Sequence, residues 1–197
     1  MRKGILSACL LCYTLIGFSQ QGVIQTTKEY VNNIYNKEYD ELLFISVSEQ
    51  KMHHIKDEKI IKTYIISTSA YGIGNQSGSN KTPEGLHKVA EKHGDNTPVN
   101  GKMIGRVFYG KIATIYTDQS KSKTDDVTSR VLWLDGIEKG KNKGEGIDSD
   151  KRYIYIHGTS EEGRLGTPSS HGCIRMRNKD VIELYKKIKI GTLVLIL

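Results

Sequence analysis

The sequence has little that marks a specialised class of protein. Only three prolines occur among 197 residues, and a content of 37% hydrophobic and 26% charged residues is ordinary for a folded chain of one domain with short additions. The chain also lacks a concentrated basic stripe, because acidic residues are interspersed among the basic ones that give its net charge of +7. This scattering argues against a nucleic-acid-binding protein. A basic surface would suit an anionic polymer such as a bacterial wall.

No hydrophobic run is long enough for an ordinary membrane span. Residues 5–18 are almost wholly apolar, but a spanning helix needs about 20 such residues. Two basic residues precede this run, and Gly17 and Ser19 occupy the −3 and −1 positions of a cleavage site after Ser19. We therefore interpret residues 1–19 as a signal peptide. We expect an exported protein of the periplasm or cell envelope, with no transmembrane span in its mature form.

Export leaves the chain short of cysteine. Leu6-Ser7-Ala8-Cys9 resembles a lipid-attachment box, but almost no apolar segment precedes it, so simple cleavage is preferred over a lipid anchor at Cys9. Cys9 and Cys12 both lie in the signal segment, and Cys173 is then the only cysteine of the mature chain. A lone thiol in an oxidising compartment cannot form an intrachain disulfide. Such a thiol is either buried and inert or kept for its reactivity.

The remaining sequence predicts a mostly β fold. We expect a short N-terminal segment at 20–41, with a helix over residues 26–39, and one folded domain at 42–197. Polar stretches at 72–85, 117–130 and 136–152 predict loops, and loops of this length often contact substrate. Short runs rich in β-branched and aromatic residues predict strands at 43–47, 52–55, 60–67, 103–109, 112–116, 131–134, 153–156 and 193–197.

One helix is predicted near the C-terminus. Asn178 is a suitable N-cap, and lysines crowd the last turn before Gly191. One apolar face is formed by Val181, Leu184, Tyr185 and Ile188.

Other conspicuous residues receive structural interpretations. The glycine-rich loop at 72–85 lacks the spacing of a phosphate-binding loop. His53 and His54 are adjacent on a predicted strand and should point to opposite faces. His87 and His93 lie in polar, loop-like sequence and are expected at the surface, and Trp133 is assigned to packing.

The strongest chemical signal lies between Tyr153 and Met176. His157 ends a predicted strand, and Cys173 follows it by 16 positions. A thiol becomes a useful nucleophile when an imidazole accepts its proton, and both His157 and His171 are candidates. His171 is two residues from Cys173 in a turn and need not touch it. We therefore expect His157 to be the proton donor and acceptor and Cys173 to be the nucleophile.

The residues around Cys173 add to this prediction. Gly172 permits positive φ and a close approach of substrate, so amides near Gly172 and Cys173 are suited to bind an oxyanion. Arg175 is placed to bind a substrate carboxylate in a bidentate way.

Two simpler explanations of these residues were weighed. Cys173 is a buried structural thiol in the first of them. A metal site of His157, His171 and Cys173 is the second, but a structural zinc site needs four ligands and typically paired cysteines. We therefore expect neither a metal nor any other cofactor.

These motifs resemble those of the YkuD-type L,D-transpeptidase family. The resemblance rests on His157-Gly158-Thr159 and on the run Ser170-His171-Gly172-Cys173-Ile174-Arg175-Met176. Two further segments, 45–51 and 81–85, resemble the first strand and a loop of that family. The resemblance extends over residues 42–197, which it identifies as the catalytic domain.

The resemblance implies a β-sandwich-like fold with one packed C-terminal helix and long loops. It implies that Cys173 attacks a peptidoglycan tetrapeptide stem, releases D-alanine and passes the acyl group to an amine, forming 3→3 cross-links. It places His171 and Gly172 at the oxyanion site and Arg175, Ser170 and Gly158 at the substrate. Three alternatives remain open: an L,D-carboxypeptidase, a cross-link endopeptidase and a non-catalytic wall-binding protein.

Overall fold

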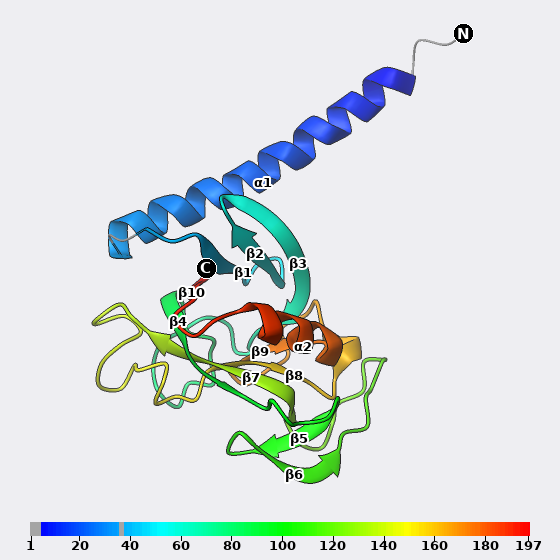
Figure 1. Cartoon of the computed structure of the whole chain (residues 1–197), viewed down its shortest axis with the longest axis vertical. Coiled ribbons are helices and arrows are strands. Elements are labelled where there is room, and N and C mark those ends of the chain that lie inside the picture. Colours follow the sequence, from blue (N-terminus) through cyan, green and yellow to red (C-terminus); the bar gives the residue numbers. More distant parts are fainter. Residues whose placement is uncertain (1–4, 36–37) are drawn as a thin grey trace.

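The computed structural model describes residues 5–35 and 38–197, and for residues 5–19 it describes the backbone only. In the described residues a mostly β domain carries a long helix, α1 (Ile5–Tyr35), on its outside and a short one, α2 (Asn178–Lys187), packed between strands (Figure 1). The predicted fold class is confirmed. The strands are β1 (Glu41–Ser46), β2 (Lys51–Lys56), β3 (Lys59–Ser67), β4 (Gly85–His93), β5 (Gly101–Ile104), β6 (Val107–Ile112), β7 (Val127–Gly136), β8 (Tyr155–Gly158), β9 (Ile174–Met176) and β10 (Leu193–Ile196).

Eight of these strands close into a ring. Hydrogen bonding follows the order β4-β10-β1-β2-β3-β9-β8-β7-β5-β6, and β4 also pairs with β7. Most neighbours are antiparallel, but β1 pairs with β10 and β8 pairs with β9 in parallel. The β5–β6 hairpin extends from β7 outside the ring. Closure leaves the ring strands without a long free edge, which protects them from pairing with other chains.

The strands β1 and β10 are buried on both faces, which explains their continuous apolar runs. Leu43 and Ile45 of β1 point into the central core, where residues from both halves of the ring meet. Leu42 and Phe44, which alternate with them, point outward into a second cluster that includes Val31 of α1. A strand between a core and a helix is expected to be apolar on both faces, as positions 42–45 of β1 are.

Helix α2 completes the central core. Its predicted apolar face is confirmed, because Val181, Leu184 and Tyr185 are all buried in the central cluster. The predicted start is one residue late: Arg177 is the N-cap, and Asn178 is the first helical residue. The Asn178 side chain does not cap the helix. It is buried and accepts hydrogen bonds from the hydroxyls of Thr128 and Ser129 instead.

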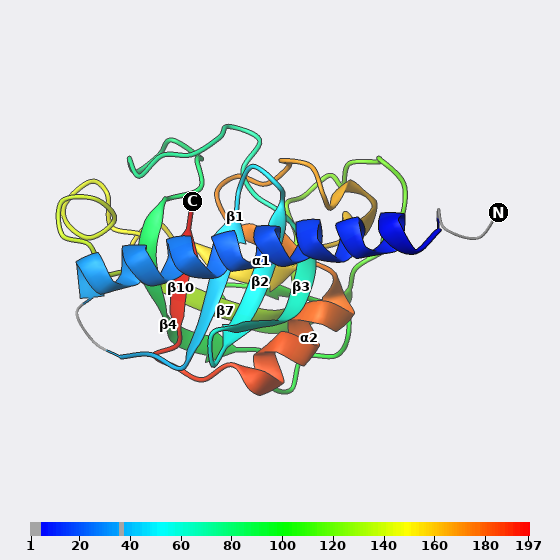
Figure 2. The same ribbon diagram turned by 90° about the horizontal axis from the view of Figure 1, so that it is seen from above.

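Helix α1 runs across the outer face of β1, β2, β3 and β10 (Figure 2). The helix predicted over residues 26–39 is therefore wrong in extent, since it begins at Ile5 and ends at Tyr35. No proline interrupts the upstream sequence, and apolar residues of α1 from Val23 onward pack on the ring. Residues 1–4 of the predicted signal peptide lie outside the described residues, and for residues 5–19 only the backbone is described. No helix in the described part of the chain is both long and apolar enough to cross a membrane.

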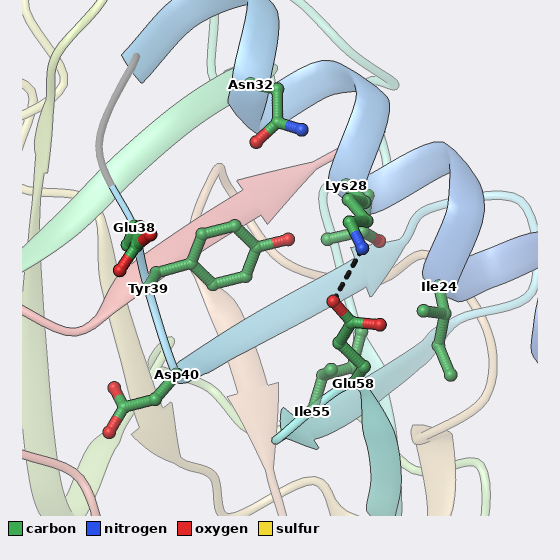
Figure 3. A pocket seen from close by; sticks show the side chains of 9 residues that line it. Ile24, Lys28, Asn32, Glu38, Tyr39, Asp40, Ile55 and Glu58 are labelled. Atoms are coloured by element: carbon green, nitrogen blue, oxygen red, sulfur yellow. Dashed lines mark hydrogen bonds and ion pairs between the residues drawn. The ribbon is translucent and has the colours of Figure 1, made fainter.

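A hollow of about 320 Å³ lies where α1 meets the 38–40 segment and β2 (Figure 3). The Lys28 ammonium and the Glu58 carboxylate cross it with an ion pair of 2.6 Å. Both side chains are largely exposed, so this pair contributes little to stability. None of the residues expected to act chemically lines this hollow.

Three further segments differ from the sequence prediction. Residues 85–93 form β4 instead of a loop: Leu86, His87 and Val89 are buried on it, and it pairs with β10 and β7. The run at 103–109 is not one strand but a hairpin turned at Gly105 and Arg106, both at positive φ. The strand predicted at 112–116 is wrong, since residues 113–116 lie in coil and Ile112 ends β6.

His87 is fully buried on β4, and the prediction that it lies at the surface is wrong. Its Nδ1 lies 3.0 Å from the Gly85 carbonyl oxygen and its Nε2 lies 2.9 Å from the Ser149 hydroxyl, which fastens the 136–152 loop to the ring. Burial is the main cause that lowers its pKa from 6.5 to about 4. The imidazole is therefore neutral in the folded chain at neutral pH.

This burial predicts an acid-sensitive fold. Between pH 6.5 and 4 the unfolded chain binds a proton at His87 that the folded chain does not, so stability falls as the pH falls. The loss saturates below pH 4 at about 3 kcal/mol. Urea unfolding at pH 7.5, 5.5 and 4.5 should show a weaker pH dependence for His87→Gln than for the parent chain, even though the substitution lowers stability at pH 7.5. An equal pH dependence in both chains would refute this.

Candidate active site

The parallel pair β8–β9 brings the predicted site residues together. His157 pairs in register with Arg175, and Cys173 immediately precedes β9. Because side chains alternate along a strand, Tyr155 and His157 share one face of β8. The register that pairs Ile156 with Ile174 sets Cys173 opposite Tyr155, and the two side chains pack in one cluster, so Cys173 lies on this same face. The 16 positions that separate His157 from Cys173 in the sequence thus form the connection between two adjacent parallel strands.

The thiol of Cys173 lies in a partly apolar setting. Its Sγ accepts a hydrogen bond from Tyr155 N–H at 3.4 Å and donates to the Tyr153 carbonyl oxygen at 3.4 Å. It packs against a cluster that contains Trp133 and Tyr155. Burial dominates its electrostatics and raises the pKa of the Cys173 thiol to about 12. The resting residue is therefore a neutral thiol.

His157 is 2% exposed, and its tautomer is fixed by the backbone. Its Nδ1 lies 2.7 Å from the carbonyl oxygen of Gly158, which can only accept, so Nδ1 carries the proton. The other nitrogen, Nε2, then has a lone pair when the ring is neutral. Burial lowers the pKa of His157 below 6.5, and the charge of Asp125 opposes this shift. At neutral pH His157 is a neutral base.

No direct hydrogen bond joins Cys173 and His157 among the side chains that the structure describes. The thiol proton instead points to Tyr153, 3.4 Å away. A single rotation about the Cα–Cβ bond of Cys173 would redirect the sulfur, and catalytic contacts often tighten only when substrate binds.

The turn before Cys173 is held by hydrogen bonds around Ser170. Its hydroxyl donates to the Cys173 carbonyl oxygen at 2.6 Å and accepts from the Gly172 N–H at 3.2 Å. Gly172 has φ +125°, and a Cβ there would contact carbonyl oxygens of the 72–85 loop. The positive φ is what favours glycine here, since these contacts, at 3.4 Å or more, are ordinary van der Waals distances. Ser170 is fully buried, so a direct substrate contact, as expected from the sequence, does not fit this geometry.

Gly158 is also buried, beneath the site. A Cβ on it would lie 2.6 Å from Asn178 Oδ1 and 2.7 Å from the Thr128 carbonyl oxygen. The same Asn178 donates to the Thr159 carbonyl oxygen at 2.8 Å. Gly158 thus lets α2 and β7 pack closely behind His157, and a substrate contact does not fit its position.

Arg175 is occupied by protein carboxylates. Its Nη1 lies 2.8 Å from Glu161 Oε2, its Nη2 lies 2.5 Å from Asp125 Oδ1, and the side chain is 2% exposed. The expected substrate carboxylate would have to displace one of them. Asp125 also accepts a hydrogen bond from exposed His171, at 2.8 Å from its Nδ1. This aspartate thus ties the 113–126 loop to both Arg175 and His171.

Sequence reasoning missed the carboxylates and a second arginine. Asp125 and Glu161 lie in polar stretches without a pattern, so nothing in the sequence paired them with Arg175. Arg152 lies near enough to Cys173 that each affects the pKa of the other. Its guanidinium donates to carbonyl oxygens of the 72–85 loop, at Gly74, Asn75 and Lys81. The glycine-rich loop, assigned no role from sequence, is fastened beside the nucleophile turn.

The described side chains include no group of three or more histidines, cysteines or acids arranged to hold a metal ion. The arrangement can instead perform nucleophilic acyl transfer, since it offers a thiol, a neutral imidazole on the same face and a glycine turn with backbone amides.

The raised pKa of the thiol predicts slow alkylation. Because the thiolate is the reactive form, iodoacetamide should label Cys173 more slowly than free cysteine at pH 7, with a rate that still rises above pH 10. Intact mass measured over pH 6–10.5 would follow the reaction. A rate that levels off below pH 7 would instead indicate a preformed thiolate–imidazolium pair.

The fold and site define a mostly β domain with a cysteine and a histidine on adjacent parallel strands. Comparison with known proteins makes this specific. Residues 40–196 match the family model of the L,D-transpeptidase catalytic domain. The chain belongs to the YkuD family of L,D-transpeptidase catalytic domains.

Individual relatives agree. YqjB of Bacillus subtilis is 48% identical over 48 residues, which are 24% of this chain and 27% of YqjB. YbiS of Escherichia coli is 44% identical over 41 residues, 21% of this chain and 13% of YbiS. The names of both proteins assign them to the L,D-transpeptidases. The matched segments span about a quarter or less of these relatives.

A solved L,D-transpeptidase from Xylanimonas cellulosilytica superposes with a TM-score of 0.50 at 17% identity, covering 82% of this chain and 62% of that one. At this identity the likeness concerns the fold.

Proposed function

We propose that this chain is an exported, cysteine-dependent L,D-transpeptidase of the cell envelope that acts on peptidoglycan stem peptides. Family membership supports the class of activity. The observation that carries the chemistry is the neutral His157, with its Nδ1 proton held by the Gly158 carbonyl, on the same strand face as the Cys173 thiol.

In the first half-reaction Cys173 is the nucleophile. His157 Nε2 takes the thiol proton as the sulfur attacks the carbonyl carbon of the third residue of a tetrapeptide stem. The Gly172 N–H is already engaged with Ser170, so we assign the Cys173 N–H as an oxyanion donor. Collapse of the tetrahedral intermediate breaks the peptide bond, and His157 returns the proton to the departing amine of D-alanine. A thioester remains on Cys173.

In the second half-reaction an amine of another stem attacks the thioester. His157 accepts the proton of this amine, and the Cys173 sulfur departs and regains a proton. The product is a 3→3 cross-link. Attack by water would instead give a tripeptide or open a cross-link, and the same residues would serve those hydrolytic reactions.

The remaining motif residues support the site indirectly. We assign Ser170 and Gly172 to shaping the nucleophile turn and Gly158 to the packing behind His157. Arg175, through Asp125, holds the 113–126 loop over the site, and His171 joins it there.

The decisive experiment is product analysis with tetrapeptide wall fragments. The chain should form a Cys173-linked acyl-enzyme, visible by intact mass, and then dimers joined 3→3, with Cys173→Ala as the inactive control. Tripeptides without dimers would assign a hydrolase. Absence of any Cys173-dependent product would refute the enzyme and favour a wall-binding protein.

A further inference from the structure

Two arginines act on Cys173 electrostatically, and both are already engaged with protein groups. Arg175 donates to the carboxylates of Glu161 and Asp125. The Arg152 guanidinium donates hydrogen bonds to backbone carbonyl oxygens of the 72–85 loop. Arg175 is neutralised by these carboxylates, and three of the five N–H donors of Arg152 are taken by the loop. A third arginine, Arg106, differs from both.

Arg106 is held at the tip of the β5–β6 hairpin, which projects on the side of the ring away from α1 (Figure 1). Gly105 and Arg106 form its two-residue turn with φ +52° and +71°, as expected for a tight hairpin. The guanidinium carbon lies 4.2 Å from the centre of the Trp133 ring. Its Nη1 donates to the Tyr155 hydroxyl at 3.3 Å. The ring and the hydroxyl fix its position.

Arg106 has no carboxylate partner. In the ranges 5–35 and 38–197, no described carboxylate oxygen lies within 4.0 Å of its nitrogens. The acid that acts on it electrostatically is Glu91, whose carboxylate is hydrogen-bonded to His93 at 2.8 Å. A single hydrogen bond leaves most of the guanidinium donors available. The cation is thus oriented but not neutralised by contact.

Tyr155 connects this cation to the nucleophile. Its backbone N–H bonds the Cys173 sulfur, and its hydroxyl, at the other end of the same residue, accepts from Arg106. Tyr155 is 9% exposed and Trp133 is 8% exposed, so one side of the guanidinium lies against two largely buried aromatic side chains. An ion pair formed there would be less screened than one in open water. A planar guanidinium fork matches a carboxylate in a bidentate way.

We propose that Arg106, on its Trp133 platform, binds a free carboxylate of the donor peptide and selects donors that carry one. This rests on the proposed function and assigns to Arg106 the role that sequence reasoning gave to Arg175. The length of Tyr155 separates Arg106 from the sulfur. A carboxylate on the residues that stay with the acyl group therefore fits better than the terminal carboxylate of the departing residue, which is only a few bonds from the scissile carbonyl.

Trp133 makes the proposal measurable, because it is the only tryptophan in the chain. A carboxylate bound to Arg106 should change its fluorescence. Three synthetic tetrapeptides would be titrated into the full-length Cys173→Ala chain, which binds without turnover. One has all carboxylates free, one has its terminal carboxylate amidated, and one has the carboxylates of the retained residues amidated.

We expect the third peptide to bind roughly 10- to 100-fold more weakly than the first. Adding Arg106→Gln to the Cys173→Ala chain should weaken binding of the first peptide by the same factor. It should also remove the difference in affinity between the first and the third peptide. Arg106→Lys, which keeps the charge without the fork, should retain part of the affinity. Lys111→Gln removes a charge from the same hairpin at an exposed position away from Trp133 and should leave binding unchanged.

Weaker binding of the second peptide that disappears in Arg106→Gln would also support a carboxylate site at Arg106. It would assign the terminal carboxylate of the departing residue as the group that binds there. Equal affinity of the Cys173→Ala chain for all three peptides would overturn the proposal. So would equal affinity for the first peptide with and without Arg106→Gln. A melting temperature shared by the Arg106 and Lys111 variants excludes misfolding. Because binding is measured without turnover, its failure is distinct from failure to form an acyl-enzyme, which would refute the proposed function.

Discussion

Replacing Cys173 with alanine is expected to abolish acyl-enzyme formation, and replacing His157 with glutamine to slow it by roughly 10²- to 10⁴-fold. The alanine variant has no nucleophile at all. The glutamine variant keeps the thiol, but its raised pKa leaves almost no thiolate at neutral pH, so loss of the base is costly. The double variant should be no worse than Cys173→Ala, because the two residues act as a unit.

The pH dependence separates the two roles. The parent chain should lose activity on the acid side below pH 6.5, where His157 becomes protonated, because burial lowers its pKa. In His157→Gln the rate should instead climb about tenfold per pH unit through pH 10, since hydroxide must generate the thiolate. Acyl-enzyme formation measured by intact mass from pH 5 to 10 tests this. A His157→Gln chain with the parent rate and profile would show that another group is the base.

The second large effect concerns stability. Arg175→Met is expected to lower the free energy of unfolding by about 3 kcal/mol, because it leaves Glu161 buried with one fewer partner. Arg164 still contacts Glu161 at 2.8 Å, which keeps the loss at the lower end of the range for broken buried pairs. Removing the stranded charge as well, in Arg175→Met with Glu161→Gln, should recover part of the loss.

Arg177 offers a matched control. It lies two residues further along the chain and is exposed, so Arg177→Met should change stability by less than about 0.5 kcal/mol. Urea unfolding followed by far-ultraviolet circular dichroism compares the variants. Equal losses for Arg175→Met and Arg177→Met would show that the buried pair contributes nothing.

The sequence predicted those parts of the molecule that rest on local patterns. The first three strands follow from runs of β-branched and aromatic residues and the buried face of α2 follows from helical periodicity, while the prediction that pairs Cys173 with His157 came from a motif. Strand β4 was missed because its polar residues are satisfied by distant partners, as His87 is by Ser149. Asp125 and Arg106 were missed for a related reason: each acts through contacts made across the fold, which one sequence cannot display.

The closed ring has a consequence for when the protein folds. Strand β10 lies between β1 and β4. The edge of β1 that does not pair with β2 therefore pairs only with residues 193–196, which lie about 150 residues further along the chain. Contacts of such long sequence separation form slowly. The ring therefore cannot close on a growing chain until synthesis has reached Ile196.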